Sequence, residues 1–118
     1  MTTQQSRNRR AGAEWEARLL HQLRDTGYDI ERLHLNGRED EGDLILKTGN
    51  KTYVIEAKAG QPHLAQFVKE ATLEARNYET HRNHKPQTAI GLVIIKQRNK
   101  PWSEAYVVST LAELLPHL

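Results

Sequence analysis

The chain has 118 residues, a length typical of one domain with a small hydrophobic core. Its 17 Lys and Arg and 15 Asp and Glu give a net charge of +2, which by itself does not indicate a nucleic-acid partner. The absence of cysteine excludes a disulfide framework and a zinc site with cysteine ligands, and it is consistent with an intracellular, cytoplasmic location. We expect neither a secretory signal nor a membrane span, because no apolar run approaches the ~20 residues that a span needs.

The N-terminal quarter predicts a basic arm followed by a helix. Residues 1–9 are polar and predict a flexible arm, and residues 10–118 predict a single domain. From about Arg10 to Thr26, apolar residues recur at the spacing of one helix face, and Gly27 suits the end of this helix. The face consists of Trp15, Leu19, Leu20 and Leu23.

Glu16 interrupts that apolar face. A carboxylate on a buried face is costly unless it is paired, hydrogen-bonded or bound to a metal. Taken alone, Glu16 fits a position at the rim of the face or an ion pair with an arginine, whereas beside an acidic metal site it fits a metal ligand. Glu14 lies on the polar face, where we expect it to be solvated and to suit the helix dipole.

The segment from Tyr28 to Lys58 predicts three strands. Tyr28–Leu35 alternates loosely between apolar and polar residues, and residues 36–42 form a polar loop in which Arg38 is either solvated or a phosphate contact. Two β-branched runs then flank the turn Thr48-Gly49-Asn50-Lys51, which predicts a hairpin over residues 43–58.

The two ends of this hairpin carry the candidate site. Asp43 opens the first strand, and Glu56-Ala57-Lys58 ends the second. Glu56 and Lys58 share a face because alternate strand residues point the same way, and the turn brings Asp43 back toward Glu56. Two carboxylates suit Mg²⁺ or Mn²⁺, and a lysine beside them can orient an activated water or stabilise charge on a phosphate.

The second half of the chain predicts helix, strand, strand and helix. Gly60 and Pro62 end the hairpin, and His63–Thr80 predicts a helix with one apolar face. The near-continuous apolar run in Thr88–Lys96 suits a central strand, and Tyr106–Val108 is a short last strand. That helix face consists of Leu64, Phe67, Val68, Ala71, Ala75 and Tyr78, with Gln66, Lys69 and Glu70 lying off it.

The last helix begins at Thr110 with a capping box, Thr110-x-x-Glu113. Trp102 fits the edge of the core, a dimer contact or a residue that stacks on bases, with the core edge as the default. The complete order predicts an α/β fold with one mixed sheet and helices on both faces (α-β-β-β-α-β-β-α).

Three basic clusters are either solvated charge or phosphate contacts, and the second reading gains weight beside an acidic site. They comprise Arg7, Arg9 and Arg10, then Arg82, His84 and Lys85, then Lys96, Arg98 and Lys100. The histidines lack convincing metal spacing. The residues that we select as candidate DNA contacts are Arg7, Arg9, Arg10, Arg38, Gln66 and Lys69.

Residues 7–60 resemble the PD-(D/E)xK nucleases, and most closely the archaeal Holliday junction resolvases. The resemblance rests on Arg10-Ala11-Gly12-Ala13-Glu14-Trp15-Glu16, on Leu19-Leu20 and Gly27-Tyr28, and on Asp43 with Val54-Ile55-Glu56-Ala57-Lys58. One departure is Gly42, where the wider superfamily often has proline.

This resemblance implies a restriction-endonuclease-like core, a homodimer, and Mg²⁺-dependent cleavage of branched DNA. It assigns Asp43, Glu56 and the Ala57 carbonyl to the metal, Glu16 to the metal through water or to a second metal, and Lys58 to catalysis. Two alternatives stay open: a restriction-like or repair endonuclease on duplex DNA, and a non-catalytic DNA-binding or assembly protein of the same fold.

Overall fold

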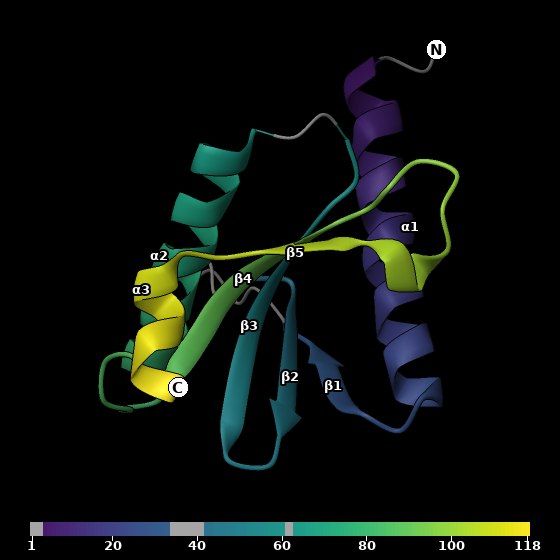
Figure 1. Cartoon of the computed structure of the whole chain (residues 1–118). Helices are drawn as coiled ribbons and strands as arrows, with labels where there is room; N and C mark the ends of the chain where they lie inside the picture. Colours follow the sequence, from purple (N-terminus) through teal and green to yellow (C-terminus); the bar gives the residue numbers. More distant parts are fainter. Residues whose placement is uncertain (1–3, 34–41, 61–62) are drawn as a thin grey trace.

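A computed structural model describes residues 4–33, 42–60 and 63–118, with the side chains of residues 4–9 left out (Figure 1). Within these residues the regular elements follow the predicted order of helices and strands. They are α1 (Gln4–Asp25), β1 (Asp29–Arg32), β2 (Leu44–Thr48), β3 (Lys51–Lys58), α2 (Leu64–His81), β4 (Ala89–Ile95), β5 (Tyr106–Val108) and α3 (Leu111–Leu114). Short 3₁₀ helices cover Trp102–Glu104 and Leu115–His117.

The strands form one mixed sheet with the spatial order β1-β2-β3-β4-β5. Neighbouring strands pair antiparallel, except that β3 and β4 pair parallel, with Lys58 opposite Ile95. The parallel pair requires a crossover, which α2 supplies. In Figure 1, α1 and α2 lie on opposite sides of the sheet. The predicted α/β fold class is therefore confirmed.

Residues of β3 face alternately toward the two helices. Ile55 packs with Trp15 and Leu19 of α1, whereas Val54 packs with Ala75 and Tyr78 of α2. The period of two in a strand thus gives each helix its own core. Glu56 and Lys58 have the same parity as Val54, so their side chains lie on the α2 side of the sheet.

α2 packs very closely on the sheet at Gly91 of β4. A Cβ at Gly91 would lie 2.4 Å from the carbonyl oxygen of Ala71 in α2, so no larger residue fits there. This close approach brings the polar residues of α2 next to the end of β3. Trp102 packs against the α1 core cluster, which confirms its prediction as a core-edge residue.

Several predicted boundaries need correction. α1 begins at Gln4 and not at Arg10, so residues 4–9 are part of the helix, while the predicted flexibility of residues 1–9 stays a prediction. β1 covers only Asp29–Arg32. Leu64, predicted to face the core, is 48% exposed because it lies at the first turn of α2, beyond the packed part of the sheet.

The capping box at Thr110 is half formed. The Thr110 hydroxyl accepts a hydrogen bond from the backbone N–H of Glu113, as predicted. The Glu113 side chain does not return to Thr110 but is buried and contacts Arg76 of α2 and the backbone of β4. In the part of the chain that the structure describes, no helix is long and apolar enough to cross a membrane.

Candidate metal and catalytic site

Asp43 and the end of β3 are held together by backbone hydrogen bonds. The N–H of Asp43 donates to the carbonyl of Ile55 at 3.0 Å, which extends the β2–β3 ladder by one residue. The Asp43 carboxylate in turn accepts a hydrogen bond from the N–H of Ala57 at 2.8 Å. The hairpin therefore brings the Asp43 side chain close to Glu56 and Lys58, the residues on either side of Ala57.

Glu56 and Lys58 lie side by side on the α2 face of β3. Glu56 is 8% exposed, and its Oε1 lies 3.6 Å from the Nζ of Lys58. The same ammonium is 3.3 Å from Oε2 of Glu70 and 4.8 Å from the centre of the Phe67 ring, both in α2. Two carboxylates and one aromatic face thus fix the position of the Lys58 charge.

The helix α2 contributes two acids that the sequence reasoning did not select. Carboxylate oxygens of Glu56, Glu70 and Glu74 all lie within 4.8 Å of one another. Glu74 is buried, and the sequence contained the signal for it, because it lies three residues after Ala71 and four before Tyr78 on the apolar helix face. The test that singled out Glu16 in the first helix would also have found Glu74 in the second.

The backbone conformation at Gly42 excludes the proline that often precedes this aspartate in the wider superfamily. Its φ angle is +95°, whereas the proline ring fixes φ near −65°. A Cβ at this position would lie 3.1 Å from Oε2 of Glu74 and 3.0 Å from Cγ1 of Val54. Glycine therefore leaves room for the Glu74 carboxylate next to the start of β2.

Burial and mutual repulsion make the two hairpin acids hard to ionise. Desolvation, followed by the negative charge of Glu56, raises the pKa of Asp43 from 3.8 to about 8. Desolvation, followed by the neighbouring Glu74 carboxyl, raises the pKa of Glu56 from 4.5 to about 9. In the absence of a cation, these neighbouring acids therefore resist full ionisation at neutral pH.

The neighbouring acids stabilise the charged form of Lys58. Burial lowers its pKa, but the charges of Glu56 and Glu70 more than offset that effect and raise the pKa above 10.5. Its ammonium is therefore protonated at neutral pH. A protonated lysine can orient a water molecule or neutralise an anionic oxygen, but it cannot accept a proton.

Glu16 forms an ion pair with an arginine, which was one of the two arrangements expected for it as an isolated carboxylate. Its Oε2 accepts a hydrogen bond from Nε of Arg32 at 2.8 Å, on the α1 side of the sheet. Its negative charge also contributes to the raised pKa of Asp43, so the two carboxylates are neighbours. The metal role of Glu16 stays a prediction. Glu14 is exposed, in line with its expected solvation.

The candidate DNA contacts are spread over the surface. Arg10, Gln66 and Lys69 are exposed, and Gln66 donates a hydrogen bond to Glu70 at 3.2 Å. The side chains of Arg7 and Arg9 and the whole of Arg38 lie outside the described residues.

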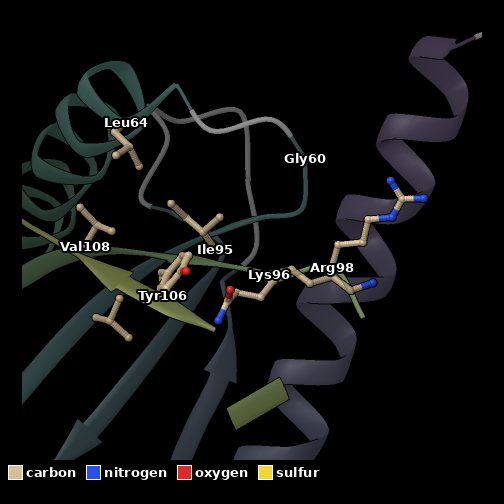
Figure 2. A pocket seen from close by; sticks show the side chains of 9 residues that line it. Gly60, Leu64, Ile95, Lys96, Arg98, Tyr106 and Val108 are labelled. Atoms are coloured by element: carbon tan, nitrogen blue, oxygen red, sulfur yellow. The ribbon is translucent and has the colours of Figure 1, made fainter. Parts of the chain in front are cut away.

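A separate pocket of about 500 Å³ lies where β4 and β5 meet the start of α2 (Figure 2). Its apolar lining includes Leu64, Ile95 and Val108, and Tyr106, Lys96 and Arg98 also line it. Gly60, two residues beyond Lys58, belongs to the same lining, so the pocket lies beside the acidic site. Two members of one basic cluster, Lys96 and Arg98, therefore line this pocket.

A comparison with protein-family models and with curated proteins finds no match. Among solved structures, the chain is similar to Hjc, a Holliday junction resolvase from the archaeal hyperthermophile Archaeoglobus fulgidus. The sequences are 16% identical, the alignment covers 88% of this chain and 98% of that chain, and the TM-score is 0.49. An identity this low adds nothing about the chemistry, so the functional argument rests on the residues of the site.

Proposed function

We propose that this chain is a divalent-cation-dependent endodeoxyribonuclease of the PD-(D/E)xK type that hydrolyses phosphodiester bonds in branched DNA, as Holliday junction resolvases do. The observation that carries the proposal is the convergence of Asp43, Glu56 and Lys58 at the end of β3. Acids whose pKa values are raised this far, next to a charged lysine, are typical of functional sites.

The donor set fits a hard divalent cation such as Mg²⁺ or Mn²⁺. Oε2 of Glu56 is buried and has no hydrogen-bond partner among the described residues, so a cation would satisfy it. The Ala57 carbonyl suits a third ligand, because the N–H of Ala57 points to Asp43 and both groups of one strand residue point to the same side. Glu16 would join through a water molecule.

In this proposal, the cation supplies a polarised water and positive charge for the phosphate. Lys58 orients the attacking water and stabilises the charge that develops on the phosphate oxygens. Asp43 and Glu56 release their protons when they take up the cation, because only the ionised carboxylates are good ligands.

The substrate is proposed from the resemblance of residues 7–60 to the junction resolvases. Resolution requires two symmetric cuts, for which a two-fold homodimer is the natural solution. Exposed apolar residues at the C-terminal end of the chain support such a contact: Tyr106, Val107, Leu111, Leu115 and Leu118. DNA contacts are proposed for Arg7, Arg9, Arg10, Arg38, Gln66 and Lys69, and the intracellular location stays a prediction.

The test compares cleavage of four-way junctions, linear duplex and single-stranded DNA in Mg²⁺ and in EDTA. We expect Mg²⁺-dependent cleavage of the junction by the wild type and its loss in Glu56→Ala and Lys58→Ala. Cleavage that persists in EDTA, or in both variants, would contradict the proposal.

Binding in Ca²⁺, which supports binding without cleavage, separates the remaining alternatives. Structure-selective retardation of the junction supports a resolvase, whereas equal binding of linear duplex supports a restriction-like or repair endonuclease. Junction binding without cleavage in Mg²⁺ or Mn²⁺ would instead support a non-catalytic DNA-binding protein.

A further inference from the structure

We propose that the pocket between β4, β5 and the start of α2 binds one unpaired nucleotide of the DNA, with its base stacked on Tyr106 and its phosphate next to Lys96 and Arg98. We refer to this cavity as the Tyr106 pocket. The choice of DNA as the ligand rests on the function proposed above, whereas the shape and charge of the pocket do not. Its volume of about 500 Å³ is typical of a ligand pocket.

The Tyr106 pocket lies in the same row of the sheet as Lys58. Lys58 of β3 is opposite Ile95 of β4, and Ile95 is opposite Tyr106 of β5. Residues that are opposite each other in neighbouring strands have their side chains on the same face, so Tyr106 lies on the α2 face together with Lys58. Two strand spacings separate them, about 10 Å, which about three stacked nucleotides span at ~3.4 Å each. A strand with a phosphate at Lys58 would therefore bring a nearby nucleotide to the pocket.

The walls of the Tyr106 pocket suit the flat ring of a base. Leu64, Ile95 and Val108 supply apolar surface, and Figure 2 shows Tyr106 beside Ile95. Ile95 and Val108 pack into the cluster under α2, whereas Tyr106 is 58% exposed. The tyrosine ring is therefore accessible for stacking, which tolerates any sequence because every base has an aromatic face.

Positive charge borders the same pocket. Lys96 and Arg98 line it, and among the described residues its lining contains no acid. Both side chains are exposed, and in the part of the chain that the structure describes neither forms an ion pair. In Figure 2 they lie on the opposite side of Tyr106 from Leu64 and Val108. A nucleotide matches this division, because it joins an apolar ring to an anionic phosphate.

Hydrogen bonds fix the pocket next to Lys58. The backbone N–H of Lys96 donates to the carbonyl of Lys58 at 2.9 Å. The side-chain amide of Gln97 donates to the carbonyl of Glu104 at 2.7 Å, which ties together the two ends of the loop between β4 and β5. A base that is stacked inside a duplex cannot enter such a pocket, so the occupant is an unpaired nucleotide, as at a branch point.

The test measures binding of three four-way junctions to the full chain in Ca²⁺. The junctions are identical except at the exchange point, which has no extra nucleotide, one unpaired thymidine or one unpaired abasic residue. We expect the wild type to bind the thymidine junction about tenfold more tightly than the abasic junction, because only the thymidine has a base to stack.

Variants of Tyr106 assign this difference to the pocket. Tyr106→Ala should remove the preference for thymidine over the abasic residue, and Tyr106→Phe should retain it because the ring remains. The control Tyr28→Ala removes an exposed tyrosine outside the pocket and should also retain the preference. Thermal unfolding of each variant checks that it is folded.

Lys96→Ala tests the phosphate contact. It should weaken binding of the thymidine and abasic junctions equally, since both have the phosphate, and it should reduce the slope of affinity against salt concentration by about one contact. The control Lys47→Ala removes an exposed lysine of β2 and should leave the slope unchanged. An unchanged slope in Lys96→Ala would exclude this contact.

Equal affinity of the wild type for the thymidine and abasic junctions, or a preference retained in Tyr106→Ala, would overturn the proposal. Sedimentation velocity tests whether Tyr106 contacts a second copy instead. A Tyr106→Ala protein that dissociates into monomers and binds all three junctions equally weakly would assign Tyr106 to that contact and overturn the pocket. Cleavage in Mg²⁺ without a preference for thymidine would contradict the pocket and support the nuclease, whereas the preference without cleavage would do the reverse. No binding of any junction would contradict both.

Discussion

Two clusters of buried acids lie along α2, and they are built in opposite ways. At the C-terminal half of the helix, Arg76 forms ion pairs with Glu79 at 2.8 Å and with Glu113 at 2.7 Å. The backbone N–H groups of Ala89 and Gly91 each donate to one of these acids at 2.8 Å. We refer to Arg76, Glu79 and Glu113 as the Arg76 cluster. Its carboxylates all have a donor, and it joins α2, β4 and α3.

Nearer the start of α2, Glu70 and Glu74 meet Glu56, and Lys58 forms ion pairs with Glu56 and Glu70. A fold that needs buried acids for structure can satisfy them, as the Arg76 cluster shows. The acids around Glu56 instead raise the pKa values of their neighbours. The comparison teaches that burial alone does not mark a functional site, whereas burial that raises the pKa values of neighbouring acids does.

The largest contrast should appear between Glu56→Gln and Glu113→Gln, which change the same atoms in the two clusters. We expect Glu56→Gln to reduce the rate of junction cleavage about 100- to 1000-fold, as for the loss of one group that stabilises transition-state charge, with no loss of stability. Glu113→Gln should lower stability and leave the cleavage rate per folded molecule unchanged. Single-turnover cleavage with urea unfolding of both variants measures this, and equal effects on cleavage would contradict the comparison.

Removal of the cation from the Arg76 cluster should cost the most stability. Arg76→Ala leaves Glu79 and Glu113 buried without their cation, and we expect a loss of about 3 kcal/mol in the free energy of unfolding. Urea unfolding in EDTA measures it. The control Lys69→Ala removes an exposed cation from the same helix and should change stability by less than about 0.5 kcal/mol. A loss no larger than in the control would show that the Arg76 cluster does not stabilise the fold.

The acids of the metal site should make the cation-free protein less stable as the pH rises. The pKa values of Asp43 and Glu56 are raised to about 8 and about 9 in the folded state, so the folded state retains protons that the unfolded chain releases near pH 4. Their contribution is complete below pH 4 and is lost as the pH rises through 8 and 9. Between pH 6 and pH 9 in EDTA we expect a loss of several kcal/mol, because each group contributes about 1.4 kcal/mol for each pH unit below its folded-state pKa.

Thermal unfolding at the two pH values measures this loss. Glu56→Gln should flatten the dependence, and added Mg²⁺ should stabilise the wild type more at pH 9 than at pH 6, since the ligands must lose their protons. A wild type that gains stability between pH 6 and pH 9 in EDTA would contradict the assigned pKa shifts.

Gly42→Ala tests the space reserved for Glu74. The substitution places a Cβ at a φ angle of +95° and within 3.1 Å of the Glu74 carboxylate. We expect a loss of about 1 kcal/mol or more from backbone strain, with weaker Mn²⁺ binding. Gly12→Ala is the control, because a Cβ at Gly12 meets nothing within 4 Å and alanine favours the helix. Unchanged stability and Mn²⁺ binding in Gly42→Ala would contradict the role given to Gly42.

Arg32→Ala should have the smallest effect on stability. The Arg32 side chain is 43% exposed, so its pair with Glu16 is screened by solvent and contributes less than about 1 kcal/mol. If Glu16 serves the metal, Arg32→Ala should keep cleavage while Glu16→Gln reduces it, measured on the same junction. An equal reduction of cleavage in both variants would show that cleavage depends on the Arg32–Glu16 ion pair and not on the Glu16 carboxylate alone.

The sequence by itself determined the order of the elements and the core of the site. Strand alternation and the short turn were sufficient to place Asp43, Glu56 and Lys58 together, because all three belong to one hairpin with a fixed register. The apolar spacing of α1 and α2 predicted most of the residues that face the sheet, but it wrongly included Leu64 and missed the buried Glu74. The start of α1 was wrong because residues 4–9 carry no apolar period, although their backbone continues the helix.

Only the tertiary structure decided which charges meet across elements. That Glu70 and Glu74 approach Glu56 depends on how closely α2 packs at Gly91, and that Arg76 reaches Glu113 depends on where α3 returns to the sheet. Neither contact has a signature within a single element, since each joins residues far apart in the chain. The sequence therefore predicted where the acidic site is, and the packing of α2 decided how many carboxylates it contains and which buried acids are already neutralised.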